Sequence, residues 1–140
     1  MIARNRLALG FPAIAVLLLA GCGDDETGSG PSPTGQEQGC AVVEGGEVTI
    51  VAKDLAWDVD CIQAPKGIAF TVVVDNQDDG VNHDLQVVLD DEILRTPLEA
   101  GPVVQRLEVP ALDAGEHPYI CDVHPNMTGT LEVLEPLSES

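Results

Sequence analysis

A short segment near the end of the chain carries three side chains that could bind one soft metal ion. Cys121 is followed by His124 and then by Met127, each after two intervening residues. Met127 and Met1 are the only methionines, and we expect Met127 to lie in a loop, where methionine rarely fills a core. His83 precedes an expected strand and supplies a second imidazole. A thiolate, two imidazoles and a long axial thioether form the ligand set of a type 1 copper centre.

The elements that must position these side chains are short β-strands. From residue 47 onward, runs rich in Val, Ile and Thr are separated by clusters of Gly, Pro, Asp and Asn. We expect strands over residues 48–52, 69–74, 84–89, 103–109, 116–120 and 130–134. In this part of the chain no apolar stripe at helical spacing is found. The sequence therefore predicts an all-β fold, a Greek-key antiparallel β-sandwich with His83 at its rim.

Residues 114–133, AGEHPYICDVHPNMTGTLEV, resemble the C-terminal strand, loop and strand of the cupredoxins, the family of type 1 copper proteins. The short C-x-x-H-P-x-M loop is most similar to that of the amicyanins and is tighter than that of the plastocyanins. The resemblance covers roughly residues 47–134. It implies a cupredoxin-like sandwich that holds one copper ion near one end.

The same resemblance implies roles for individual residues. His83, Cys121 and His124 would be the equatorial copper ligands, and Met127 would be the axial ligand. The cofactor would be one copper ion that alternates between Cu(I) and Cu(II), with the electron passing through the exposed edge of His124. Because such a carrier binds no substrate, we expect no enzymatic activity.

Two positions depart from the family pattern. Asp84 stands where many cupredoxins carry an asparagine that braces the ligand loop. Its carboxylate is expected to lower the reduction potential, because it favours the more positive oxidised state. His117 stands where relatives often carry an aromatic residue. We interpret it as a surface histidine on a strand, and the alternatives are a spare ligand or an acid-sensitive group. Trp57, the only tryptophan, is interpreted as a packing residue of the core or rim.

The first 39 residues have the composition of an export signal followed by a linker. Arg4 and Arg6 precede an apolar run over residues 7–20, which is shorter than the roughly 20 residues needed to span a bilayer. The run ends in Leu-Ala-Gly-Cys22, which resembles the lipobox of bacterial lipoproteins and implies cleavage after residue 21 and lipidation of Cys22. The alternative is an ordinary signal peptide with a chance cysteine.

The chain is therefore expected to contain one folded domain. Its parts are a lipoprotein-type signal peptide over residues 1–21, a flexible acidic tether rich in Gly, Ser and Pro over 22–39, the cupredoxin-like domain over 40–136, and a tail over 137–140. Within the domain, Cys40 and Cys61 flank the first expected strand, and such pairs in exported proteins usually form disulfides. The alternative, a dithiol for redox exchange, lacks the usual C-x-x-C spacing.

The chain is strongly acidic, with 24 Asp and Glu against 6 Lys and Arg and a formal net charge of −18. This charge repels phosphate backbones and argues against nucleic-acid binding. It also predicts a redox partner with a basic docking patch, and Val123 and Pro125 are expected to form an apolar contact surface around His124. We expect a monomer on the outer face of a bacterial membrane, in the cell envelope or periplasm, where a lipid anchor is its only membrane contact.

Three other functions are compatible with parts of this pattern. A copper carrier or storage lipoprotein would use the same ligands without cycling electrons. A structural zinc site would use Cys121 and two histidines but leaves Met127 unexplained. A copper enzyme would need further histidines for a second centre, and only His117 remains for one. We therefore predict a membrane-anchored, exported blue copper protein that carries single electrons between redox partners.

Overall fold

The computed structural model describes residues 39–137 of the 140-residue chain. The predicted signal peptide, the lipidation site at Cys22 and nearly all of the predicted tether lie outside the described residues. Over residues 39–137 the chain forms strands, turns and bends. No helix long and apolar enough to cross a membrane is found in this range.

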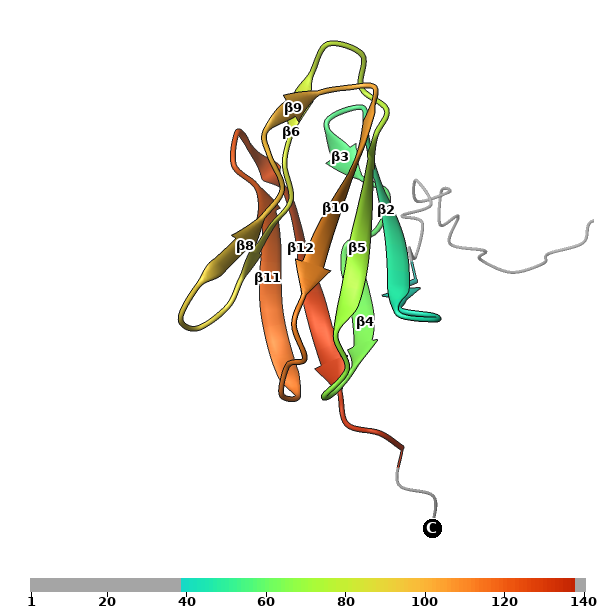
Figure 1. The fold of residues 1–140 in the computed structure, drawn as a ribbon. Helices are drawn as coiled ribbons and strands as arrows, with labels where there is room; N and C mark the ends of the chain where they lie inside the picture. Colours follow the sequence, from blue (N-terminus) through green and yellow to red (C-terminus); the bar gives the residue numbers. More distant parts are fainter. Residues whose placement is uncertain (1–38, 138–140) are drawn as a thin grey trace, which may run out of the picture. The chain divides into compact units, whose positions relative to one another are not determined.

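Within this range, twelve strands form two larger sheets and one small ribbon (Figure 1). The strands are β1 (Ala41–Val42), β2 (Glu47–Lys53), β3 (Ala56–Trp57), β4 (Cys61–Pro65), β5 (Phe70–Asn76), β6 (Asn82–His83), β7 (Gln86–Val88), β8 (Ile93–Arg95), β9 (Glu99–Ala100), β10 (Val103–Val109), β11 (Gly115–Cys121) and β12 (His124–Leu134). One sheet has the order β1-β4-β12-β11-β7-β8, the other has the order β10-β5-β2-β3, and β6 pairs with β9. The predicted all-β sandwich is confirmed.

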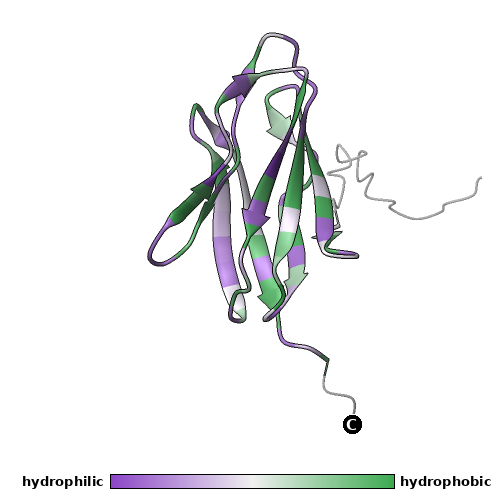
Figure 2. Ribbon diagram, in the orientation of Figure 1, coloured by the Kyte–Doolittle hydropathy of each residue, from purple (hydrophilic) through white to green (hydrophobic). Residues whose placement is uncertain are grey.

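The core lies between the two larger sheets and is built mainly from Val, Ile and Leu. In the second half of β10, charged and apolar residues alternate, so that Leu107 and Val109 are buried while Arg106 and Glu108 are exposed. Hydrophobic and hydrophilic segments alternate along the strands in Figure 2. Trp57 is 7% exposed and belongs to this core, in agreement with its interpretation as a packing residue.

Three pairs of neighbouring strands are parallel, which corrects the predicted antiparallel arrangement. β2 runs parallel to β5, and β4 runs parallel to both β1 and β12. The other pairs of strands are antiparallel. Crossovers between the sheets bring strands that are distant in sequence side by side, and an alternating apolar pattern carries no information on strand direction. The sandwich therefore has mixed sheets.

Strand boundaries differ most from the prediction near the candidate ligands. The strand expected over residues 84–89 is reduced to β7, and His83 lies in the separate ribbon of β6 and β9. At this break, the backbone N–H of Leu85 donates to Oγ1 of Thr96 (2.9 Å) instead of to a neighbouring strand. The strand expected over residues 130–134 begins earlier, at His124.

A disulfide joins Cys40 and Cys61, with an S–S distance of 2.07 Å, in agreement with the predicted pair. It links the residue before β1 to the first residue of β4, the strand with which β1 pairs. The remaining cysteine of the described range, Cys121, is free and buried. It is therefore available for another role.

Candidate metal centre

Three of the predicted ligand residues meet at one end of the sandwich. His83 ends β6, Cys121 ends β11, and His124 begins β12. Only Asp122 and Val123 connect β11 to β12, and Cys121 pairs with His124 across this turn. The C-x-x-H spacing thus forms a tight antiparallel turn, and β6 adds the second histidine.

The donor atoms of these residues are close enough to share one metal ion. The Sγ atom of Cys121 lies 3.5 Å from Nδ1 of His124 and 3.8 Å from Nδ1 of His83. All three donor atoms lie within 4.8 Å of one another. If a metal ion were bonded to the sulfur at roughly 2.3 Å and to each nitrogen at roughly 2.0 Å, with bond angles of about 110–120°, the sulfur would lie about 3.5–3.7 Å from each nitrogen. The spacing and chemistry of the donors therefore fit a metal ion.

Met127 lies in a bulge of β12 rather than in the predicted loop. The register of β12 against β11 shifts after Ile120, so that residues 125–127 have no partner on β11. Met127 is 1% exposed, whereas Pro125 and Asn126 are exposed. The bulge therefore buries the thioether although the two residues before it, Pro125 and Asn126, face solvent.

The three ligand residues differ in their exposure to solvent. His83 and Cys121 are 1% and 2% exposed, whereas His124 is only partly buried. Burial raises the pKa of the Cys121 thiol above its ordinary value, so the thiol is protonated at neutral pH when no metal is bound. A bound cation would reverse this, because its charge stabilises the thiolate.

An aspartate lies behind the first histidine. Oδ2 of Asp78 is 2.7 Å from Nε2 of His83, the ring nitrogen on the side away from Cys121. Burial opposes the charge of this carboxylate, but hydrogen bonds from His83 and from the backbone amides of Leu55 and Asp54 outweigh it and lower the pKa of Asp78. The carboxylate is therefore ionised at neutral pH.

Asp84, the departure from the family pattern, braces the turn between the ligands. Asp84 is buried, with 3% of its surface exposed. Oδ1 accepts the backbone N–H of Asp122 at 2.8 Å, and Oδ2 accepts Nε2–H of Gln86 at 2.8 Å. A carboxylate thus ties the segment after His83 to the turn that follows Cys121.

His117 takes no part in this cluster. It lies within β11 and is partly buried, and within the described residues its buried Nε2 atom has no hydrogen-bond partner. It borders a hollow of about 400 Å³ that is also lined by acidic residues, among them Asp90, Asp113 and Glu116. Its interpretation as a strand histidine agrees with the structure, but the residue is less exposed than a surface position implies.

The sequence did not point to Asp78 as part of the site. The residue stands in Asn-Gln-Asp-Asp-Gly, a run that has the ordinary composition of a turn. Its position five residues before His83 is the one available sequence signal, and that spacing belongs to no local motif. The contact depends on the path of the whole loop between β5 and β6.

A family model for the cupredoxin-like domain matches residues 33–133. The chain belongs to this family. The match includes all four predicted ligands and extends over almost the whole sandwich.

Solved structures with the cupredoxin fold are similar to this chain over most of its length. For auracyanin from the photosynthetic bacterium Roseiflexus castenholzii, the TM-score is 0.58 and the identity 18%, over 69% of this chain and 99% of that one. For auracyanin A from Chloroflexus aurantiacus, the TM-score is 0.57 and the identity 21%, over 66% and 99%. For an amicyanin variant, the TM-score is 0.52 and the identity 21%, over 64% and 83%. A comparison with curated proteins finds no match.

Proposed function

We propose that this cupredoxin is a blue copper protein that carries single electrons between redox partners. The observation that carries the proposal is the convergence of Nδ1 of His83, Sγ of Cys121 and Nδ1 of His124 within 4.8 Å. Met127, buried three residues after His124, would supply a thioether ligand. Auracyanin A, which has the same fold, is itself a blue copper protein.

When bound, copper supplies a one-electron couple between Cu(I) and Cu(II). The chain contributes a set of donors fixed by strands: His83 and Cys121 are buried at the ends of β6 and β11, where water is excluded. His124 is partly exposed and would pass the electron at the surface. Val123, at 46% exposure, and the exposed Pro125 flank it with apolar surface on which a partner could dock.

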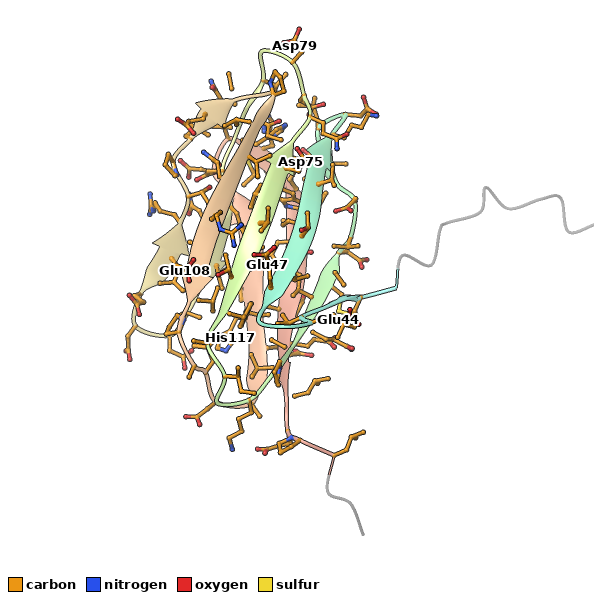
Figure 3. All side chains as sticks on the ribbon, turned by 45° about the vertical axis from the view of Figure 1, so that its right-hand side comes forward. Glu44, Glu47, Asp75, Asp79, Glu108 and His117 are labelled. Carbon is orange, nitrogen blue, oxygen red and sulfur yellow. A yellow bond between two sulfur atoms is a disulfide. The ribbon has the colours of Figure 1, made fainter. Side chains whose placement is uncertain are left out.

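The charge of the protein favours a partner with a basic docking patch. Glu47, Asp75 and Glu108 lie along the sheet of β10, β5 and β2, as Figure 3 shows, and Arg106 forms an ion pair with Glu47. We propose that the protein acts as a monomer and that its long-range field speeds encounter with a cationic partner. Electron transfer to a cationic acceptor should then slow as salt concentration rises, and an anionic acceptor should show the opposite trend.

Membrane attachment through Cys22 is the remaining part of the proposal. The lipobox-like sequence before Cys22 supports it, together with the low-complexity stretch that separates Cys22 from the domain. Expression in a bacterial host should place the protein in the membrane fraction of the cell envelope. Cys22→Ser should release it, whereas a fully retained Cys22→Ser protein would contradict lipid anchoring.

The visible spectrum of the purified protein tests the proposed copper chemistry. We expect Cu(II) to produce an intense blue band that bleaches on reduction and returns on oxidation. Cys121→Ser should abolish the band and Met127→Gln should shift it, whereas His117→Ala, which alters a histidine outside the cluster, should leave it unchanged.

Two results would overturn electron carriage. A colourless protein that binds copper only as Cu(I) would indicate a carrier or storage protein that does not cycle electrons. A protein that prefers zinc, with no change in affinity on Met127→Gln, would indicate a structural metal site.

A further inference from the structure

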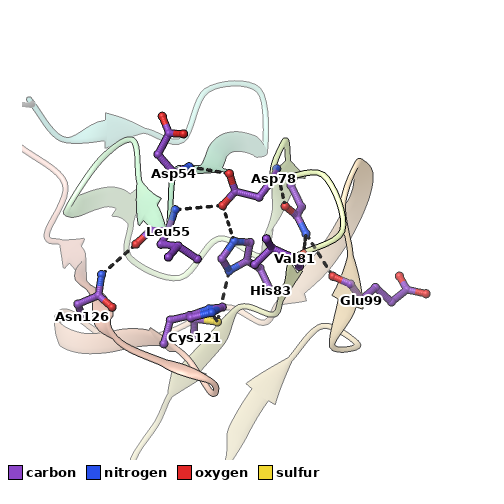
Figure 4. Close-up of polar contacts among 10 residues, drawn as sticks. Asp54, Leu55, Asp78, Val81, His83, Glu99, Cys121 and Asn126 are labelled. Atoms are coloured by element: carbon purple, nitrogen blue, oxygen red, sulfur yellow. Dashed lines mark hydrogen bonds and ion pairs between the residues drawn. The ribbon is translucent and has the colours of Figure 1, made fainter.

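We propose that Asp78 is a positioning residue of the metal centre, whose single carboxylate fixes both the ring of His83 and the β2–β3 turn beside the segment that contains Met127. The inference rests on the proposed function, because it concerns the same site. It goes further in naming a residue that touches no metal and yet sets the position of two of the ligand segments. Figure 4 shows the contacts that support it.

The first contact orients the histidine. Nε2 of His83 lies 2.7 Å from Oδ2 of Asp78, and the His83 side chain is fully buried. A neutral imidazole has one N–H and one acceptor nitrogen, so donation from Nε2 to a carboxylate leaves Nδ1 as the acceptor. Nδ1 is the atom that faces Sγ of Cys121 at 3.8 Å. Asp78 thereby selects both the tautomer and the ring orientation that a metal ion requires.

The second contact holds a turn. Asp54 and Leu55 connect β2 to β3. Their backbone φ angles are 54° and 60°, a conformation that residues other than glycine rarely adopt. The backbone N–H of Asp54 donates to Oδ1 of Asp78 at 2.6 Å, and that of Leu55 donates to Oδ2 at 3.0 Å. Two charge-assisted hydrogen bonds thus stabilise a turn that its own residues disfavour.

The β2–β3 turn is also hydrogen-bonded to the segment that contains Met127. The carbonyl oxygen of Leu55 accepts Nδ2–H of Asn126 at 2.9 Å. Asn126 lies in the bulge of β12, directly before Met127. A continuous series of hydrogen bonds therefore runs from His83 through Asp78 and Leu55 to Asn126, and it spans the two sides of the centre.

Asp78 is itself held in place by the loop that carries it. Its backbone N–H donates to Oδ1 of Asn76 at 3.0 Å, and Asn76 is fully buried. Nδ2 of Asn76 donates to the carbonyl oxygens of Val81 (3.0 Å) and Glu99 (3.2 Å). Gly101 packs so closely that a Cβ atom there would overlap the carbonyl oxygen of Asp78. The carboxylate is therefore presented by a rigid support rather than by a free loop.

The chemistry of the carboxylate is specific, because it accepts three hydrogen bonds and donates none. An amide at this position has one acceptor oxygen, so its NH₂ group must face either an N–H of the turn or the ring of His83. Asp78→Asn therefore loses at least one of the three bonds, and Asp78→Ala loses all of them. Asp79→Asn is the matched control, because Asp79 is an exposed neighbour with the same charge and no contact to the centre.

The experiment uses ¹⁵N NMR of the metal-free protein to read the tautomers of its three histidines. We expect His83 of the wild type and of Asp79→Asn to carry its proton on Nε2. In Asp78→Ala the other tautomer should become detectable, and the amide signals of Asp54 and Leu55 should lose their hydrogen-bond shifts. Copper affinity should fall roughly ten- to hundredfold in Asp78→Ala and by a smaller factor in Asp78→Asn.

The outcomes separate the inference from the proposed function. A wild type that forms no blue copper centre contradicts the proposed function, whereas the tautomer and amide signals are measured without metal. If Asp78→Ala fails to fold, Asp78→Asn carries the test alone. An Asp78→Asn protein that matches Asp79→Asn in tautomer, amide shifts and copper affinity would overturn the role of Asp78.

Discussion

The ring of Tyr119 in β11 lies against Gly129, its partner residue in β12. A Cβ atom on Gly129 would overlap the phenol ring, and the ring itself is fully buried. The hydroxyl donates to the carbonyl oxygen of Val59 at 2.7 Å. The absence of a side chain at Gly129 therefore lets Tyr119, the largest fully buried side chain of the described residues, lie across β12. Tyr119 stands two residues before Cys121.

Replacing Gly129 by alanine should destabilise the whole sandwich. The added methyl group must displace Tyr119 or push β12 away from β11, and overpacking of this kind costs about 1–3 kcal/mol of unfolding free energy. Urea unfolding measures this loss. Gly39→Ala is the matched control, since a Cβ atom there meets no other atom within 4 Å. Equal unfolding midpoints for the two variants would contradict the packing role of Gly129.

Tyr119 also predicts how stability depends on alkaline pH. Burial raises the pKa of Tyr119, and the negative charges of Asp60 and Asp58 add to this. A tyrosine of the unfolded chain has a pKa of about 10, so folding favours the neutral phenol. The contribution of Tyr119 to stability is therefore fully present below about pH 10 and is lost as pH rises above it.

The phenolate absorbance of the protein checks this directly, because Tyr119 is the only tyrosine. We expect no phenolate signal at about pH 10 while the circular dichroism of the sandwich persists, and a signal that appears together with unfolding at higher pH. Tyr119→Phe should remove the alkaline dependence that belongs to this group. A phenolate that forms in the folded protein near the ordinary pKa would show that burial has no such effect.

Local patterns predicted the parts of this protein that depend on neighbouring residues in the sequence. The expected strand over residues 103–109 coincides with β10, since charged and apolar residues alternate from Arg106 to Val109. Cys121 and His124 were identified together because a two-residue turn brings them to one point. His83, 38 positions away, was added because it precedes an expected strand at the rim of the sandwich, and the family resemblance then implied the same role.

The features that were missed all depend on contacts between distant segments. Parallel pairing of β2 with β5 follows from the route of the crossovers, which apolar alternation does not record. The burial of the Met127 side chain depends on the register shift of β12 against β11. Asp78 joins the centre only because the loop between β5 and β6 is packed on Gly101 and reaches the β2–β3 turn.

Replacing Asp84 by asparagine should raise the reduction potential of the copper centre. The amide can still accept the backbone N–H of Asp122, so the turn is retained, but a negative charge near the cation is lost. That loss disfavours the more positive oxidised state. Redox titration of the blue band measures the change, and Asp91→Asn, in the exposed β7–β8 turn, controls for net charge. Equal potentials for the two variants would show that Asp84 does not tune the centre.

The disulfide should contribute to stability mainly through the unfolded chain. Cys40 and Cys61 are 21 residues apart, and closing a loop of that length stabilises a folded protein by about 3 kcal/mol in the chain-entropy description. The double variant Cys40→Ala, Cys61→Ala should lose this amount in urea unfolding. The wild type treated with a reductant should behave in the same way. An unchanged unfolding midpoint would mean that the bond constrains little.

Trp57 should report copper binding without any added probe. It is the only tryptophan and is buried, and its ring centroid lies 6.4 Å from that of His83 and 6.3 Å from that of Tyr119. Cu(II) quenches excited indole at such short range, so titration with Cu(II) should remove most of the fluorescence and reach its end point at one ion per chain. Reduction to Cu(I) should restore part of the emission.

Zinc separates quenching by the metal from a change in packing around Trp57. Zn(II) fits the same thiolate and imidazole donors but has no unfilled d shell and no redox chemistry, so it should leave most of the emission intact. Cys121→Ser should abolish quenching at equimolar Cu(II), because it removes the sulfur donor that lies within 3.8 Å of both histidines. Equal quenching of the wild type and Cys121→Ser would show that copper binds near Trp57 without the Cys121 thiolate, and this would contradict a copper site built on Cys121.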